Sequence, residues 1–562
     1  MSRVLARRCR AAGWLGAVLM MVAACSAERA DPVEQAVSVP IADDSLVEGS
    51  DDAAHICWTS APAGGDGVEY SEVTEQVGLV EPLTGMYGHA VAVGDVDADG
   101  WLDLFVGGFA DRPVGDYRTR GASGPAPDRL LLGGPDGFSV DPTFRGQLAR
   151  TSGAVFADLT NDGRLEIVAV RNPRGATEIG RRPTVIHQRT DTGWEIAATL
   201  LDDVAGRAAA AVDIDRDGYL DLVVVADRWS GGSTRILRNL GGGDAAGSLG
   251  FDDVTSEWGM PDDMTGLALA TVDLDDDGWI DLVVSGDERV LLGGPDGFRV
   301  ERHEVLAWEV FGDEDDAAGI AIGDLDGDGR PDLVVGQHFN STLDFDERVP
   351  VRIFINRSDD DGLHLVDATD EAGSPGLWTK SPHVAVVDLD NDRWPDIVTS
   401  ATAADGRPFV LDSTGPDENG VPRFTPMGKP GDGRYWVTGA EMDIDHDGRV
   451  DAFLVEWEPA LASPAFANTS NSGRWLQVDL GGTAGAAAGT RVDVSDPASG
   501  DRIASAWVAS TTGYAAGAAP IVRFGLGTGR DDIDVRVDVT PLGGSTQTRT
   551  VPVNGHVRWS GC

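Results

Sequence analysis

The nine residues Asp95–Asp103 read DVDADGWLD, and this pattern, D-x-D-x-D-G-x-x-D, decides the fold because it returns along the chain. Further full copies begin at Asp213, Asp273, Asp324 and Asp443, and altered copies begin at Asp158 (DLTNDGRLE) and Asp388 (DLDNDRWPD). Successive copies start 51 to 64 residues apart. A period of this length indicates a repeat architecture with one structural unit per copy.

The motif has the composition of a loop that binds a hard cation. Carboxylates at positions 1, 3, 5 and 9 can converge on one centre, and glycine at position 6 permits the sharp turn. Ca²⁺ takes six to eight oxygens at about 2.3–2.6 Å, and the backbone carbonyl of position 7 can add one. These positions carry no thiolate or imidazole, which argues against zinc or copper. A plain Asp-Gly hairpin turn is the alternative, but it needs one Asp and one Gly. Without a cation, four close carboxylates would repel one another strongly.

We therefore predict five to seven bound Ca²⁺ ions. The predicted ligands, with position 7 counted for its backbone, are Asp95, Asp97, Asp99, Trp101, Asp103, Asp158, Asp162, Glu166, Asp213, Asp215, Asp217, Tyr219, Asp221, Asp273, Asp275, Asp277, Trp279, Asp281, Asp324, Asp326, Asp328, Arg330, Asp332, Asp388, Asp390, Asp392, Asp396, Asp443, Asp445, Asp447, Arg449 and Asp451. Two loops depart from the pattern. Thr160 and Glu166 replace aspartates in the second copy, and Arg393 replaces the glycine in the sixth, so metal binding there stays open.

Each motif lies between β-rich segments. A small-apolar run such as HAVAVGD precedes it, and a run such as DLVVV follows it. Further strand signals recur, of the type RLLLGGPDGF at Arg129 and FDDVTSEWGM at Phe251, which makes about four strands per repeat. Seven such repeats predict an all-β fold, a seven-bladed β-propeller with a C-terminal β-rich accessory domain. A β-solenoid is the alternative, although its periods are usually shorter.

The last repeat lacks an outer strand of the F-x-D-V-T type, and a matching strand, Tyr70–Thr74, stands before the first motif. We expect this N-terminal strand to complete the last blade and remove its open edge. Cys57 would then lie near the C-terminal Cys562, and in an oxidising compartment the two can form a disulfide. Free thiols, or pairing between chains, remain open.

The N-terminus has the features of an export signal. Arginines precede an apolar run over residues 11–24, which is too short to span a membrane and ends in Val22-Ala23-Ala24-Cys25. We expect a lipoprotein signal peptide (1–24) and lipidation of Cys25, with an ordinary signal peptide as the alternative. Residues 25–57 are predicted to be a disordered acidic tether. The protein is thus expected to be exported to a bacterial cell envelope and lipid-anchored, with no transmembrane helix in its mature form.

The net charge is −49, from 93 acidic and 44 basic residues. This charge argues against nucleic-acid binding, which needs a basic surface.

The repeats resemble the FG-GAP (VCBS) repeat of integrin-like propellers, in which an Asp-rich loop also joins a Gly/Ala-containing strand to a DLVVG-type strand. The resemblance covers roughly residues 68–470 and assigns the propeller to 58–470. The tail reads RWLQVDL from Arg474 and then GTRVDV, TTGYAAG and VRFGLG. It resembles the ASPIC/UnbV domain of proteins similar to cartilage acidic protein, which implies a β domain over 471–562. The residues that match that domain are Trp475, Gly489, Val492, Gly513, Tyr514, Phe524, Gly525, Leu526 and Gly527.

These features favour a non-enzymatic binding or adhesion module for a protein or glycan partner. GxxxxGK[ST], GxSxG and HExxH motifs are absent from the sequence. A carbohydrate-active enzyme, similar to a polysaccharide lyase and using the propeller face, is the alternative. His89 and His383 precede their Asp loops on strands expected to face the channel, so they are its candidate catalytic residues. Polar packing at the propeller axis is the simpler role for both.

Overall fold

The computed structural model describes residues 55–60, 68–173, 180–230, 232–241, 249–287, 289–307, 315–339, 348–359, 361–470, 473–481 and 488–560. The predicted signal peptide, Cys25 and most of the predicted tether therefore lie outside the described residues, as does Cys562.

Within the described residues, seven sheets of at least four strands contain the seven motifs, and the first four strands of each, in chain order, pair antiparallel. The first six, in chain order, are β3 (Gly88–Gly94), β4 (Asp103–Gly108), β5 (Arg129–Leu132) and β6 (Ser139–Val140); β7 (Thr151–Ala157), β8 (Glu166–Arg171), β9 (Thr184–Thr190) and β10 (Gly193–Leu200); β11 (Gly206–Val212), β12 (Asp221–Ala226), β13 (Arg235–Asn239) and β14 (Phe251–Asp253); β15 (Leu269–Val272), β16 (Asp281–Val284), β17 (Arg289–Leu292) and β18 (Arg299–Arg302); β19 (Asp315–Gly323), β20 (Asp332–Phe339), β21 (Arg352–Asn356) and β22 (Leu365–Asp367); β23 (Val384–Val387), β24 (Asp396–Ala403), β25 (Pro408–Pro416) and β26 (Pro422–Pro426), with β27 (Pro430–Tyr435) also paired to β24. The last combines β28 (Thr438–Met442), β29 (Asp451–Val455) and β30 (Ala465–Asn468) with β2 (Tyr70–Glu72).

The first strands of these sheets contact one another around a common axis. β3 contacts β7, β7 contacts β11, and the series continues through β15 and β19 to β23, while β28 contacts β3. A shared apolar cluster that includes Ala385 and Leu454 joins the sixth sheet to the seventh. The axial strands are rich in Gly and Ala, as in GHAVAVG of β3 and GRAAAAV of β11, and both are buried along their whole length. Small side chains allow strands to approach closely there. The chain is all-β and forms an integrin-like β-propeller, as the sequence predicts.

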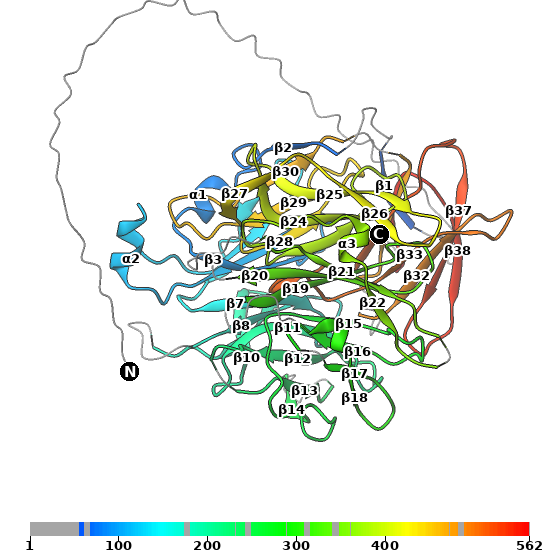
Figure 1. Ribbon diagram of the computed structural model, residues 1–562. Helices are drawn as coiled ribbons and strands as arrows, with labels where there is room; N and C mark the ends of the chain where they lie inside the picture. The colour runs from blue at the N-terminus through cyan, green and yellow to red at the C-terminus, as the bar shows by residue number, and fades with distance from the viewer. Residues whose placement is uncertain are drawn as a thin grey trace, which may run out of the picture. The chain divides into compact units, whose positions relative to one another are not determined.

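The N-terminal strand closes the propeller. β2 pairs antiparallel with β30, with Tyr70 opposite Asn468 and Glu72 opposite Phe466. The Val73 amide continues the ladder by donating to the Ala465 carbonyl at 2.8 Å. Figure 1 shows these two strands, from opposite ends of the propeller sequence, lying side by side. The predicted closure is confirmed, and it leaves the last sheet with a paired edge.

The C-terminal β domain consists of two sheets that enclose one apolar core, in which Leu476, Val492, Phe524 and Val537 are buried. Its strands are β31 (Trp475–Asp479), β32 (Arg491–Ser495), β33 (Arg502–Trp507), β36 (Ile521–Gly525), β37 (Asp534–Thr540), β38 (Gln547–Pro552) and β39 (Gly555–Arg558), joined by the N-terminal β1 (His55–Thr59). β1 pairs with β39. The expected boundary at residues 57/58 falls inside β1, so this strand belongs to neither the tether nor the propeller. Its ladder to β39 fixes it to the far end of the chain.

A segment of the C-terminal domain enters the propeller. It spans Ser510–Ala519, contains β34 (Thr511–Thr512) and β35 (Ala516–Gly517), and is called the axial segment below. β35 pairs parallel with β3, and Gly513 exchanges backbone hydrogen bonds with Ile320 of β19. The Ser510 hydroxyl accepts from the Ala211 amide at 3.1 Å, and the Thr511 hydroxyl donates to the Leu269 carbonyl at 3.2 Å. The segment therefore bonds to first strands on several sides of the axis.

Helical structure among the described residues is limited to short turns in the connections. These are α1 (Val80–Leu83), α2 (Val114–Thr119), η1 (Glu304–Leu306) and α3 (Thr369–Ala372).

Candidate metal-binding loops and the propeller axis

Each motif forms the turn between the first and second strands of its sheet, and the position-1 aspartate organises it. Asp95 Oδ1 accepts from the Asp99 amide and Asp95 Oδ2 accepts from the Gly100 amide, both at 3.1 Å. The position-5 carboxylate forms the next hydrogen bond of the turn: Asp99 Oδ1 accepts from the Trp101 amide at 2.9 Å. The same two bonds to position 1 recur in the loops that begin at Asp158, Asp213, Asp273, Asp388 and Asp443. One backbone geometry thus serves full and altered copies.

That geometry requires two left-handed residues per loop. Position 4 has φ near 60°, as at Ala98 (61°) and His446 (57°), and position 6 has φ near 90°, as at Gly100 (92°). Arg393 adopts φ 92° in the sixth loop, and its amide donates to Asp388 Oδ2 at 2.7 Å. The arginine therefore takes the glycine conformation at a cost in strain, and the loop keeps its shape. The guanidinium lies over the Trp394 ring at 4.7 Å.

Position 9 also has a structural role that the sequence reasoning missed. Asp103 Oδ2 accepts from the Val96 amide at 2.7 Å, and Asp103 Oδ1 accepts from the Gly133 amide, beyond the third strand, at 2.8 Å. The equivalent pairs of bonds hold Asp221, Asp281, Asp332, Asp396 and Asp451. Glu166 reproduces the first bond, from the Leu159 amide at 2.8 Å. The position-9 carboxylate thus ties three strands together.

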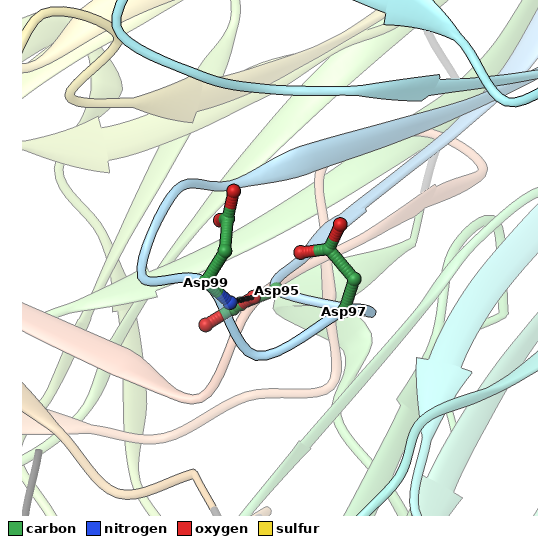
Figure 2. A group of neighbouring side chains, drawn as sticks. All are labelled: Asp95, Asp97 and Asp99. Atoms are coloured by element: carbon green, nitrogen blue, oxygen red, sulfur yellow. Dashed lines mark hydrogen bonds between the residues drawn. The ribbon is translucent and has the colours of Figure 1, made fainter.

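The remaining carboxylate oxygens converge. In at least five loops, three acidic residues place one oxygen each within 4.8 Å of one another; these are Asp95, Asp97 and Asp99; Asp213, Asp215 and Asp221; Asp273, Asp275 and Asp281; Asp324, Asp326 and Asp332; and Asp388, Asp390 and Asp396. Figure 2 shows the first group projecting from the single turn between β3 and β4.

These groups fit a cation. Buried oxygens without a hydrogen-bond partner occur at position 3, as Asp97 Oδ1 and Asp275 Oδ1, and at position 1, as Asp324 Oδ1. Burial, and then the neighbouring Asp447 and Asp445 charges, raise the pKa of Asp443 to about 8. Burial likewise raises the pKa of Asp273 to about 7. A bound cation would relieve both the unpaired oxygens and the repulsion, so the donor set suits an oxygen-coordinated divalent ion.

The loops differ in how their charge is already balanced. Arg357 forms ion pairs with Asp326 and with Asp328, the latter at 3.1 Å, and Arg558 contacts Asp95 Oδ2 at 3.1 Å. Arg330 and Arg449 are predicted ligands through their backbone carbonyls. Their side chains form ion pairs with Asp328 and Asp447 of their own loops. Among the described residues, no ion pair reaches the carboxylates of the loops at Asp213 and Asp273. In the second loop, the Thr160 hydroxyl is buried without a partner.

The aromatic residues at position 7 pack against neighbouring loops. The Trp101 ring stacks on His446 at 3.7 Å between centroids, and Arg216 lies over Trp279 at 3.5 Å. His446 and Arg216 both occupy position 4 of the preceding loop in the ring. The Trp101 and Trp279 side chains thus pack between loops, and they couple adjacent blades.

His89 and His383 lie at the axis, with Tyr514 of the axial segment between them. Arg207 Nη1 donates to the Tyr514 hydroxyl at 3.2 Å and lies 3.1 Å from His89 Nε2. The Tyr514 amide donates to His383 Nδ1 at 3.3 Å, while His383 Nε2 lies 3.0 Å from Glu441 Oε1. Tyr514 is 2% exposed and His89 4%. The structure therefore assembles a His/Tyr/Arg cluster that the sequence did not reveal, but buries it.

The cysteine predictions are tested only at Cys57. This residue, on β1, is disulfide-bonded. Its expected partner Cys562 and the predicted lipidation site Cys25 lie outside the described residues. No helix among the described residues is long and apolar enough to cross a membrane.

Comparisons with known proteins agree with the repeat geometry. Residues 213–284 match the FG-GAP-like repeat and residues 317–349 match the FG-GAP repeat. Mouse integrin alpha-7 is 28% identical over 230 residues, covering 38% of this chain and 18% of that protein. Human integrin alpha-7 is 27% identical over 242 residues, covering 40% and 20%. The chain thus spans about a fifth of the length of these relatives.

A solved structure described as BBS1N in complex with ARL6DN, soaked with lead, is also similar. Its sequence identity is 13% and its TM-score 0.27, covering 57% of this chain and 94% of that chain. The sequence matches, rather than this structure, support an integrin-like FG-GAP repeat protein.

Proposed function

We propose that this protein is a calcium-binding adhesion module, exported and held to the cell envelope by a lipid on Cys25, that binds a protein or glycan partner. The observation that carries the calcium proposal is the set of converging carboxylates with buried, unpartnered oxygens at Asp97, Asp275 and Asp324. The similarity to integrin alpha-7 supports an adhesion-like role.

The proposed metal sites are filled by Ca²⁺ bound through Asp and Glu oxygens, most tightly in the loops at Asp213 and Asp273. No arginine in the described part of the chain forms an ion pair with the carboxylates of these two loops, whereas Arg357 already contacts two carboxylates of the loop at Asp324. Calcium-45 binding or calorimetry on the mature chain tests this order of calcium affinity among the loops. Absence of any saturable calcium binding at millimolar concentrations would exclude the proposal.

The binding proposal is tested separately from the metal. Purified mature protein is applied to a glycan array and used in pull-downs with calcium and with EDTA. We expect retention of a partner only with calcium. Lipidation is tested by mass spectrometry of the N-terminus, with Cys25→Ser as the variant that releases the protein from membranes; an unlipidated wild-type N-terminus would exclude the anchor.

A carbohydrate-active enzyme remains the second candidate, because His89, Arg207 and Tyr514 now lie together. Binding is favoured over catalysis because these side chains are buried and bonded to one another, so they offer no open face to a polymer. Incubation with a polysaccharide panel distinguishes the two. Release of unsaturated sugars that is lost in His89→Ala would favour the enzyme.

A further inference from the structure

A cavity of about 180 Å³ lies between the propeller and the C-terminal domain. Its walls include Val93, Ile322 and Val386 at the ends of first strands, and Trp507 and Ile521 from the C-terminal domain. Its volume corresponds to roughly a dozen water molecules, at about 15 Å³ of accessible space each. Apolar and polar groups share the lining, which also includes Asp324, Asp388 and Glu441; a mixture of apolar walls and placed polar groups is typical of small-molecule sites.

Arg523 is a basic residue of the C-terminal domain that lines this cavity. It lies on β36 between Val522 and Phe524, which point into the core of the C-terminal domain. Alternation along the strand turns Arg523 to the opposite face, and it lines the cavity. Its Nε and Nη2 atoms are buried and have no hydrogen-bond partner. A buried donor without a partner costs free energy, and more when the group is charged.

These two atoms form one edge of the guanidinium, and that edge matches a carboxylate. Elsewhere in this chain, Arg530 uses the same edge to hold both oxygens of Asp532, with an Nε–Oδ1 distance of 2.8 Å and an Nη2–Oδ2 distance of 2.6 Å. Such side-by-side bonds are the strong mode of arginine–carboxylate recognition.

The acids near Arg523 already have other polar partners. Glu441 contacts His383 at 3.0 Å, and Asp479 contacts Arg558 at 2.9 Å. Asp443 and Asp451 belong to the seventh metal loop. Calcium in that loop would balance them, so this step rests on the proposed function. Among the described residues, none of these carboxylates forms a hydrogen bond with the Nε and Nη2 atoms of Arg523.

We propose that this cavity binds a small organic acid, with the carboxylate on the Nε and Nη2 edge of Arg523 and the apolar body against the walls. An anion there satisfies both buried donors at once. Water satisfies them only with neutral dipoles, which bond a guanidinium less strongly than a carboxylate does. The apolar walls at Val93, Ile322 and Trp507 favour an aliphatic or aromatic acid over an inorganic anion.

The test uses the mature full-length protein. Calorimetry first measures calcium binding, which reports on the metal loops alone. Benzoate and hexanoate are then titrated into the calcium-saturated protein, with benzamide and hexanamide as neutral counterparts and inorganic phosphate as a further arm. We expect saturable binding of at least one acid and at least tenfold weaker binding of its amide. Arg523→Gln is expected to weaken acid binding at least tenfold. Arg536→Gln, at an exposed arginine paired with Asp538, is the matched control and should change nothing.

The outcomes separate the two proposals. Binding of neither acid, equal binding of acid and amide, or binding of phosphate alone would overturn the organic-acid site even when calcium binds normally. Acid binding that persists in a folded Arg523→Gln would also overturn it. Acid binding without any calcium binding would support the site and exclude the calcium proposal. If Arg523→Gln does not fold, the comparison of acid and amide binding to the wild-type protein still tests the organic-acid site.

Discussion

Replacement of Tyr514 by alanine is the sharpest test of the idea that the C-terminal domain holds the propeller together from within. Tyr514 is 2% exposed, packs with Leu267, Ala318 and Val437, and accepts a hydrogen bond from Arg207 at 3.2 Å. Its carbonyl also accepts from the Thr438 hydroxyl, so strands far apart in sequence meet at this one residue.

The magnitude follows from these contacts. Truncating a buried aromatic residue to alanine typically costs about 3–5 kcal/mol. Tyr514→Phe keeps the ring and removes only the hydroxyl, so it should cost about 1–2 kcal/mol because Arg207 loses one acceptor. Arg207 keeps its ion pair with Asp227, which limits this loss.

Urea unfolding in calcium, followed by tryptophan fluorescence and circular dichroism, measures both variants. We expect Tyr514→Ala to lower the unfolding midpoint of propeller and C-terminal signals together. Trp378→Ala, at a side chain 41% exposed, serves as the control and should change stability by less than about 0.5 kcal/mol. A cost below about 1 kcal/mol for Tyr514→Ala, or a propeller transition that stays unchanged, would refute the reasoning.

Three further predictions concern the loops and the closure. Arg393→Gly should raise stability by about 1 kcal/mol in thermal melts, because glycine occupies φ 92° without the steric cost that arginine bears; a fall in melting temperature would contradict the strain. Asp215→Ala should remove one calcium site, about 1.4 kcal/mol at a tenfold excess of calcium over the dissociation constant, and should have little effect in EDTA, whereas Asp162→Ala should lose less; equal losses in both media would point to a purely structural role. Thr74→Val should cost about 1–2 kcal/mol in urea unfolding, because the buried Thr74 hydroxyl accepts from the Ala465 amide at 3.1 Å in the closing strand; an unchanged midpoint would argue against closure by this strand.

The sequence predicted the repeats because each one carries its own local signal. Four carboxylates and a glycine specify a turn, and the runs on either side specify its strands. Closure by Tyr70–Glu72 was predictable for the same reason, since the last repeat lacked a strand type that the N-terminus supplied. The altered sixth loop was harder to judge, because hydrogen bonds from the Asp392 and Arg393 amides to Asp388 hold Arg393 in a glycine conformation.

What the sequence did not reveal depends on contacts between distant segments. β1 carries no repeat signal, and only its pairing with β39 assigns it to the C-terminal domain. Tyr514 stood out as part of a G-Y turn, but nothing local placed it at the propeller axis. Arg523 left a faint signal, a charged residue between Val522 and Phe524 in an apolar strand. Such a residue faces either solvent or another domain, and only the structure shows which.

These long-range contacts also bear on how a partner would approach. The C-terminal domain reaches the metal loops directly: Arg558 contacts Asp95, Gln477 Nε2 donates to Asp443 Oδ2 at 3.0 Å, and the Gly527 amide donates to the Asn391 carbonyl at 2.9 Å. Loops engaged in this way have their candidate cation sites at an interface within the chain. Calcium there would stabilise the docking of the two domains as well as each blade. A partner of the proposed adhesion module would therefore meet the loops at the opposite ends of the strands, and calcium would affect its binding through the stability of the propeller rather than by direct contact.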